Sequence, residues 1–137
     1  MRSLGLDIGD KRIGVALSDP DGILASPFTI INRRDESQDI EAIVDIISQQ
    51  GVGRVIVGLP RSMDGSLGSQ AEKVEAFTQR LASRIQVPLE YRDERLTTVL
   101  AKRLRQAAGG KKKRKARDDA QAAALILQGY LDEGREP

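Results

Sequence analysis

Three acidic residues, Asp7, Glu94 and Asp119, stand where a folded chain could bring carboxylates together. The sequence predicts Asp7 in a strand just before a tight turn, Glu94 just after a short strand, and Asp119 in the first turn of the last helix. Sites in α/β proteins form outside the carboxyl ends of parallel strands. Carboxylates converging there would hold one or two Mg²⁺ or Mn²⁺ ions, which prefer oxygen ligands. Such ions activate water for attack on a phosphodiester.

Each carboxylate also has a purely structural interpretation. Asp7 could brace its own hairpin, Glu94 could interact with the positive end of a helix dipole, and Asp119 could cap its helix. Asp93 and Asp118 are adjacent competitors for the roles of Glu94 and Asp119. Spacing alone leaves these alternatives open.

The amino-acid composition excludes several kinds of catalytic and metal site. The 137 residues include no cysteine and no histidine, which excludes thiolate nucleophiles and Ser-His-Asp catalysis and argues against a zinc site. The four aromatic residues are too few for a base-stacking platform. No signal peptide or membrane-length apolar run is visible, so we expect a cytoplasmic protein that does not contact a membrane. The length predicts one domain, residues 1–137.

Positive charge is concentrated in one part of the chain. Residues 92–117 hold eleven basic and two acidic side chains, a charge of 11 − 2 = +9, which leaves +2 − 9 = −7 for the rest. A basic region on an acidic protein suits a nucleic-acid backbone; a solvated basic loop, tail or targeting patch is the alternative. The expected phosphate contacts are Lys11, Arg12, Arg61, Arg95, Lys111, Lys112, Lys113, Arg114 and Lys115.

The hydrophobic pattern predicts the elements that carry these residues. Strands at 3–8, 13–18 and about 23–31 form a meander, and helical spacing begins at Ile40 and ends at Gly51. A buried strand at 54–58, a helix at 71–85 and a strand at 89–92 follow. Thr97 or Thr98 starts a helix that ends before a flexible basic loop, 109–117. The last helix runs from about 118 to 131, before a polar tail at 132–137. The order βββαβαβαα predicts an α/β fold with a mixed five-stranded sheet and helices on both faces.

Four ordered blocks of this sequence resemble the bacterial YqgF/RuvX-type family. They are residues 7–16 (DIGDKRIGVA), Gly58-Leu59-Pro60 with 63–66 (MDGS), 93–98 (DERLTT), and Asp119 with Ala123, Ala124, Ile126, Leu127 and Tyr130. The resemblance implies an RNase H-like fold related to RuvC-type resolvases. It implies a nuclease that matures the 5′ end of pre-16S rRNA or resolves Holliday junctions. It makes Asp7, Glu94 and Asp119 the metal ligands, and it places a flexible basic segment before the last helix.

The sequence departs from that pattern at two places. RuvC-type resolvases carry a further acid near the last aspartate, where this chain has Ala122, so the resemblance implies a site of three carboxylates. Arg117 and Asp118 stand where apolar residues are expected. Arg95 is expected either to pair with Asp7 or Asp119 in the metal-free protein or to clamp a phosphate.

Four functions compete at this point. The first is a Mg²⁺- or Mn²⁺-dependent hydrolase that cleaves phosphodiester bonds in structured RNA, with pre-ribosomal particles as partners. The second is a resolvase of branched DNA, which needs a two-fold dimer; the sequence shows no dimer element, so we expect a monomer or a weak homodimer. The third is a non-catalytic nucleic-acid- or ribosome-binding module. The fourth, an actin-type ATPase, needs two lobes, for which 137 residues leave no room.

Overall fold

The computed structural model describes residues 1–60, 68–93 and 115–134, the last helix by its backbone alone as far as residue 119. The strands are β1 (Arg2–Ile8), β2 (Arg12–Ser18), β3 (Ala25–Asn32), β4 (Val52–Leu59) and β5 (Leu89–Asp93). The helices are α1 (Glu36–Gln50), α2 (Ser69–Ala82) and α4 (Lys115–Gly134). The predicted helix after Thr97 lies outside the described residues.

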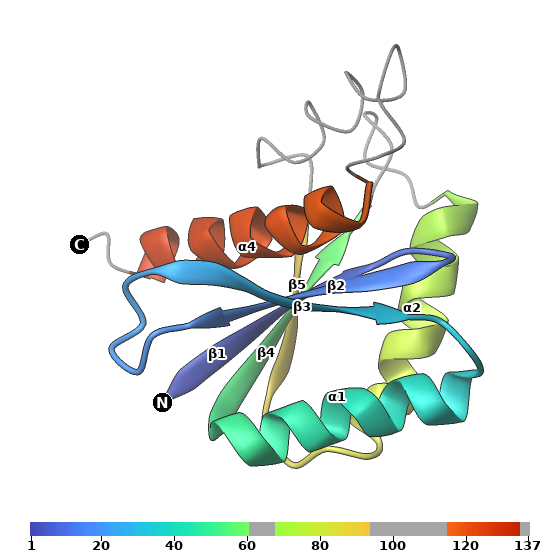
Figure 1. Cartoon of the computed structure of the whole chain (residues 1–137), viewed down its shortest axis with the longest axis horizontal. Coiled ribbons are helices and arrows are strands. Elements are labelled where there is room, and N and C mark those ends of the chain that lie inside the picture. Colours follow the sequence, from blue (N-terminus) through green and yellow to red (C-terminus); the bar gives the residue numbers. More distant parts are fainter. Residues whose placement is uncertain (61–67, 94–114, 135–137) are drawn as a thin grey trace.

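A single five-stranded sheet, in the order β3-β2-β1-β4-β5, forms the centre of the fold. The pairs β1–β2 and β2–β3 are antiparallel, whereas β1–β4 and β4–β5 are parallel. Helix α4 covers one face, and α1 and α2 cover the other (Figure 1). The predicted mixed sheet with helices on both faces is therefore confirmed.

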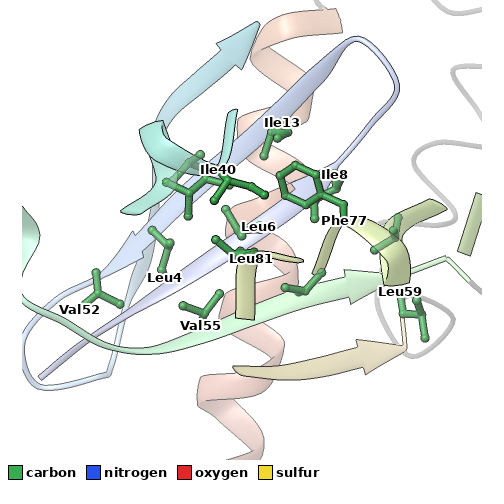
Figure 2. Close-up of a cluster of buried hydrophobic side chains, with 14 of the residues drawn as sticks. Leu4, Leu6, Ile8, Ile13, Ile40, Val52, Val55, Leu59, Phe77 and Leu81 are labelled. Atoms are coloured by element: carbon green, nitrogen blue, oxygen red, sulfur yellow. The ribbon is translucent and has the colours of Figure 1, made fainter. Parts of the chain in front are cut away.

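The side chains of β1 point alternately to the two faces of the sheet, and each face has its own hydrophobic cluster. Leu4, Leu6 and Ile8 join a cluster with side chains of α1, α2 and β4, part of which is drawn in Figure 2. The α4 side has its own cluster, in which Ile56 of β4 packs with Ala123, Ile126 and Leu127 of α4, among other residues. Successive strand residues point to opposite faces, so Gly5 and Asp7 belong to the α4 face. The expectation that Asp7 lies opposite Leu6 and Ile8 is confirmed.

The first residues of strand β3 and of helix α1 differ from the sequence prediction, because in both places an aspartate side chain accepts hydrogen bonds from backbone N–H groups. Asp19 Oδ1 accepts the N–H groups of Ile23 at 2.7 Å and Leu24 at 3.0 Å, so the loop extends through Leu24 and β3 starts at Ala25. Helix α1 starts at Glu36, before the apolar spacing begins, because the Asp35 side chain caps it by accepting the N–H of Gln38.

The bounds of two helices, α2 and α4, also differ from the sequence prediction. Helix α2 ends at Ala82 with Ser83 as its C-cap, although Ile85 still packs against the core, which explains why the apolar spacing continues beyond the helix. Helix α4 starts at Lys115, three residues before position 118, and continues through Gly134. It therefore includes 115–117, predicted as loop, and 132–134, predicted as tail. Lysine, alanine and arginine at 115–117 are strong helix formers. Among the described helices, none is long and apolar enough to span a bilayer.

Candidate functional site

Asp7 is a buried carboxylate near the end of the central strand. Its exposed fraction is 4%, and it pairs across the sheet with Gly14 of β2. It lies on the α4 face, next to the edge at which the parallel strands β1, β4 and β5 end at Ile8, Leu59 and Asp93. We call this the carboxyl edge. A charged group buried there requires polar or ionic partners.

Helix α4 approaches β1 very closely at Gly5. A Cβ built on Gly5 would lie 2.8 Å from Leu127 Cβ and 2.9 Å from the Ala123 carbonyl oxygen, so only glycine fits. Further along α4, Gln128 binds the backbone of Ile23 and Ala25, which belong to the β2–β3 loop and the start of β3. That loop lies beside the amino end of β1. The first turns of α4 therefore lie toward the carboxyl edge, as Figure 1 also shows.

This packing brings two of the predicted site positions into the same neighbourhood. From Gly5, Asp7 is two residues further along β1, about 7 Å at the usual rise of a strand. From Ala123, Asp119 is one turn back along α4, about 6 Å at the usual rise of a helix. Both steps run toward the carboxyl edge. The positions of Asp7 and Asp119 thus lie on facing elements, whereas the side chain of Asp119 is outside the described residues.

Of the other predicted site residues, Glu94 comes directly after a strand that ends at the carboxyl edge, and most of the rest lie outside the described residues. Strand β5 pairs in parallel with β4, with Asp93 opposite Leu59, so the chain leaves β5 at the carboxyl edge. Glu94 is the next residue in the sequence and lies outside the described residues. The same is true of Arg61, Arg95, Lys111, Lys112, Lys113 and Arg114, and only the backbone of Lys115 is described.

Residues 9–12, which comprise the turn between β1 and β2 together with the first residue of β2, present two predicted phosphate contacts. The Gly9 N–H donates to the Arg12 carbonyl at 2.9 Å, and a Cβ on Gly9 would lie 2.8 Å from that oxygen. Lys11 is exposed and Arg12 is partly buried. A tight turn thus carries both cations beside the strand end that holds Asp7.

Arg33 is a residue at this turn that sequence reasoning missed. Its backbone N–H donates to the Lys11 carbonyl at 2.9 Å, and its Nη1 donates to the Gly9 carbonyl at 3.0 Å. The signal in the sequence was weak: Arg33 precedes Arg34 and the helix cap Asp35, and stands out only as one of two basic loop residues.

Arg92, in contrast, stands in the basic region of the sequence, but its side chain packs within the fold. Its side chain is 9% exposed, forms an ion pair with Glu133 and lies against Gly129 of α4. Its Nε is buried without a hydrogen-bond partner. This arginine ties β5 to the end of α4.

Within the described ranges, no three Asp or Glu side chains gather closely enough to form a metal site. Of the three predicted ligands, only Asp7 has a described side chain, and Asp7 is not without an interaction partner in the protein. The described part of the site therefore consists of a buried carboxylate, a braced basic turn and the start of α4.

The sequence matches the family model described as "RuvX: Holliday junction resolvase" over residues 1–133. The chain belongs to the RuvX family. A relative from Desulforamulus reducens, named "Putative pre-16S rRNA nuclease", is 50% identical over 135 residues, covering 98% of each chain. A relative of the same name from Moorella thermoacetica is 49% identical over 133 residues, covering 96% of this chain and 95% of its own. The resemblance of the four sequence blocks is thus confirmed.

Solved structures identify the fold of this RuvX-family chain as RNase H-like. Thermus thermophilus RuvC in complex with a Holliday junction substrate has a TM-score of 0.62 at 15% identity, covering 98% of this chain and 97% of RuvC. The fowlpox virus resolvase, bound to Holliday junction DNA, has a TM-score of 0.58 at 11% identity, covering 99% of this chain and 100% of the resolvase. At such low identities the likeness is one of fold.

Proposed function

We propose that this protein is a metal-dependent nuclease that hydrolyses phosphodiester bonds in structured RNA, with the 5′ end of the 16S rRNA precursor as its substrate. The observation that carries the proposal is the buried Asp7 at the carboxyl edge, facing the helix that carries Asp119, in a chain of a nuclease family. Two relatives named for this substrate at about half identity support the choice of RNA. In this proposal the enzyme acts in the cytoplasm on pre-ribosomal particles.

Asp7, Glu94 and Asp119 are the proposed ligands of Mg²⁺ or Mn²⁺. Their donors are all oxygen atoms, the ligands these hard cations prefer, and the chain has no histidine or cysteine to favour a softer metal. A cation between Asp7 and the start of α4 would also stabilise a carboxylate that is almost excluded from water. When bound, the ion supplies an activated water and stabilises charge on the leaving oxygen.

The basic residues hold and orient the substrate in this proposal. Lys11 and Arg12 contact phosphates from the turn between β1 and β2, next to the strand end that carries Asp7. Arg61, Arg95 and the cations at 111–115 extend the contact along the RNA backbone. These contacts are blind to sequence and give binding a steep salt dependence.

The test compares wild-type protein with Asp7→Asn on an RNA carrying the precursor 5′ end, with Mg²⁺ or Mn²⁺. Asp10→Asn is the matched control, because Asp10 is an exposed residue of the turn that follows β1, three residues after Asp7, and its ion pair with Lys73 is long, at 3.6 Å. We expect Asp7→Asn to lose cleavage while keeping RNA binding, and Asp10→Asn to cleave normally. Equal cleavage by Asp7→Asn and wild type would contradict the proposed site.

A second candidate, resolution of four-way DNA junctions, is favoured by the description of the matching family and by two structural neighbours bound to junction DNA. It requires a two-fold dimer that makes two symmetric cuts. The same assay with a four-way DNA junction separates the candidates. Symmetric nicks in the junction with the RNA left intact would favour the resolvase.

A further inference from the structure

Arg33, the first residue after β3, holds two carbonyls of the turn between β1 and β2. Its main-chain N–H donates to Lys11 O and its Nη1 donates to Gly9 O, at 2.9 and 3.0 Å. Gly9 is the second residue after Asp7, and Lys11 is the exposed cation of the turn. One arginine therefore restrains the backbone on which two proposed site residues depend.

Arg33 is itself fixed by the core. Its Nε donates to Asp39 Oδ2 at 3.2 Å, and Asp39, in α1, is only 3% exposed. The other oxygen of Asp39 accepts the N–H of Arg34 at 3.1 Å. The guanidinium lies over the ring of Phe77, a core residue of α2, at 4.9 Å from its centroid. These contacts anchor Arg33 to both helices on the far face of the sheet.

We propose that Arg33, oriented by Asp39 and Phe77, is a positioning residue that sets the turn at 9–12 and with it the placement of Asp7 and Lys11 for phosphodiester cleavage. The inference rests on the proposed nuclease function. Arg33 acts through the turn and touches neither metal nor substrate. A rigid turn matters because misplacing a catalytic group by about 1 Å can cost 10²-fold in rate.

The chemistry at this position specifically requires arginine. The planar guanidinium can donate from Nε to Asp39 while Nη1 donates to Gly9, in two fixed directions. A lysine keeps the positive charge but has a single ammonium that cannot span both acceptors in this geometry. Arg33→Lys therefore removes the side-chain bond to the Gly9 carbonyl, keeps the main-chain bond to the Lys11 carbonyl, and leaves the electrostatic attraction for RNA almost unchanged.

The experiment uses the full chain with Arg33→Lys and, as control, Arg84→Lys, whose ion pair with Glu41 is exposed and joins α1 to the segment after α2. Cleavage of the precursor RNA gives kcat and KM at a temperature well below both melting points. Amide hydrogen exchange at Gly9, compared with Leu6 in the core of β1, reports the turn itself. Asp39→Asn, which keeps the side-chain shape, serves as a second variant if Arg33→Lys does not fold.

We expect Arg33→Lys to lower kcat at least tenfold with a smaller change in KM, and to speed exchange at Gly9 at least tenfold while exchange at Leu6 is unchanged. Arg84→Lys should match wild type in both. Faster exchange at Gly9 with unchanged kcat would overturn the positioning role, and unchanged exchange would overturn the brace. If wild-type protein cleaves nothing, the proposed function fails, and the exchange data alone decide whether Arg33 holds the turn.

Discussion

The close approach of β1 and α4 at Gly5 can be tested with a single methyl group. In Gly5→Ala, the new Cβ would lie 2.8 Å from Leu127 Cβ and 2.9 Å from a backbone oxygen, that of Ala123. Ordinary contact begins at 3.4 Å, so α4 must move by about 3.4 − 2.8 = 0.6 Å. Neither neighbouring atom is the end of a flexible side chain, so the helix cannot avoid the methyl group by changing a rotamer.

The expected decrease in stability follows from overpacking. Forcing a methyl group into a packed core costs about 1–3 kcal/mol, and rigid neighbours place this case at about 2–3 kcal/mol. The entropy of unfolding of 137 residues is about 0.29 kcal/mol/K, at about 2.1 cal/mol/K per residue. The melting temperature should therefore fall by about 7–10 °C. Because α4 carries Asp119, cleavage measured well below that temperature should also fall, by about tenfold.

The assay is thermal unfolding followed by circular dichroism, with RNA cleavage measured on the same preparations. Gly134→Ala is the control, because it adds the same methyl group to the last residue of α4, where a Cβ meets nothing within 4 Å. We expect its melting temperature to stay within about 2 °C of wild type. A melting temperature for Gly5→Ala equal to that of Gly134→Ala would refute the packing of α4 on β1 described above.

Three further predictions concern the end of α4, the loop after β2 and the basic segment. Glu133→Gln should lower stability by about 1 kcal/mol in denaturant unfolding, because it leaves the guanidinium of Arg92, whose side chain is only 9% exposed, without its ion pair, while Glu133 itself is more than half exposed. Hydrogen bonds from the N–H groups of Leu24 and Ile23 lower the pKa of Asp19 below its ordinary value of 3.8. The ionised carboxylate therefore stabilises the folded state fully above pH 3.8, and this contribution is lost as the pH falls through the lowered pKa of the folded state. The stability difference between wild type and Asp19→Asn should therefore shrink below pH 3.8. Neutralising residues 111–115 should flatten the salt dependence of RNA binding by about 0.7 in log–log slope for each phosphate that the variant no longer neutralises, and an unchanged slope would exclude the segment from the interface.

Much of the fold was predictable because hydrophobic periodicity reports burial directly. Alternation along β1 separated Asp7 from Leu6 and Ile8, and the continuous apolar run of β4 marked a strand covered on both faces. The polar first turn of α1, residues 36–39, could not be assigned in this way, because its helical state depends on a cap at Asp35 rather than on apolar spacing.

The placement of the candidate site was only partly predictable. Asp7 stands where the sequence predicted it, but its relation to α4 depends on which strand the helix crosses and in which direction, a long-range property. Gly5 carried a readable signal, since a glycine inside a strand often marks a close backbone approach.

The roles of Arg33 and Arg92 could not be predicted, because both depend on partners outside their own elements. Arg33 binds the turn at residues 9–12 and Asp39, and Arg92 pairs with Glu133. A count of charges in the sequence does not distinguish one arginine from another, whereas the contacts in the folded protein give Arg33 and Arg92 structural roles.

Asp7, Glu94 and Asp119 are proposed to form one metal-binding catalytic site. The most direct test measures cleavage of the precursor RNA by Asp7→Asn, Glu94→Gln and Asp119→Asn beside their sequence neighbours, Asp93→Asn and Asp118→Asn, with melting temperatures as a check on folding. Each of the first three should slow cleavage by about a thousandfold or more, because several kcal/mol of charge stabilisation is removed at about 1.36 kcal/mol per factor of ten. The two neighbours should cleave at close to the wild-type rate. Full activity in any of the three, or an equal decrease in Asp118→Asn and Asp119→Asn, would contradict the assignment.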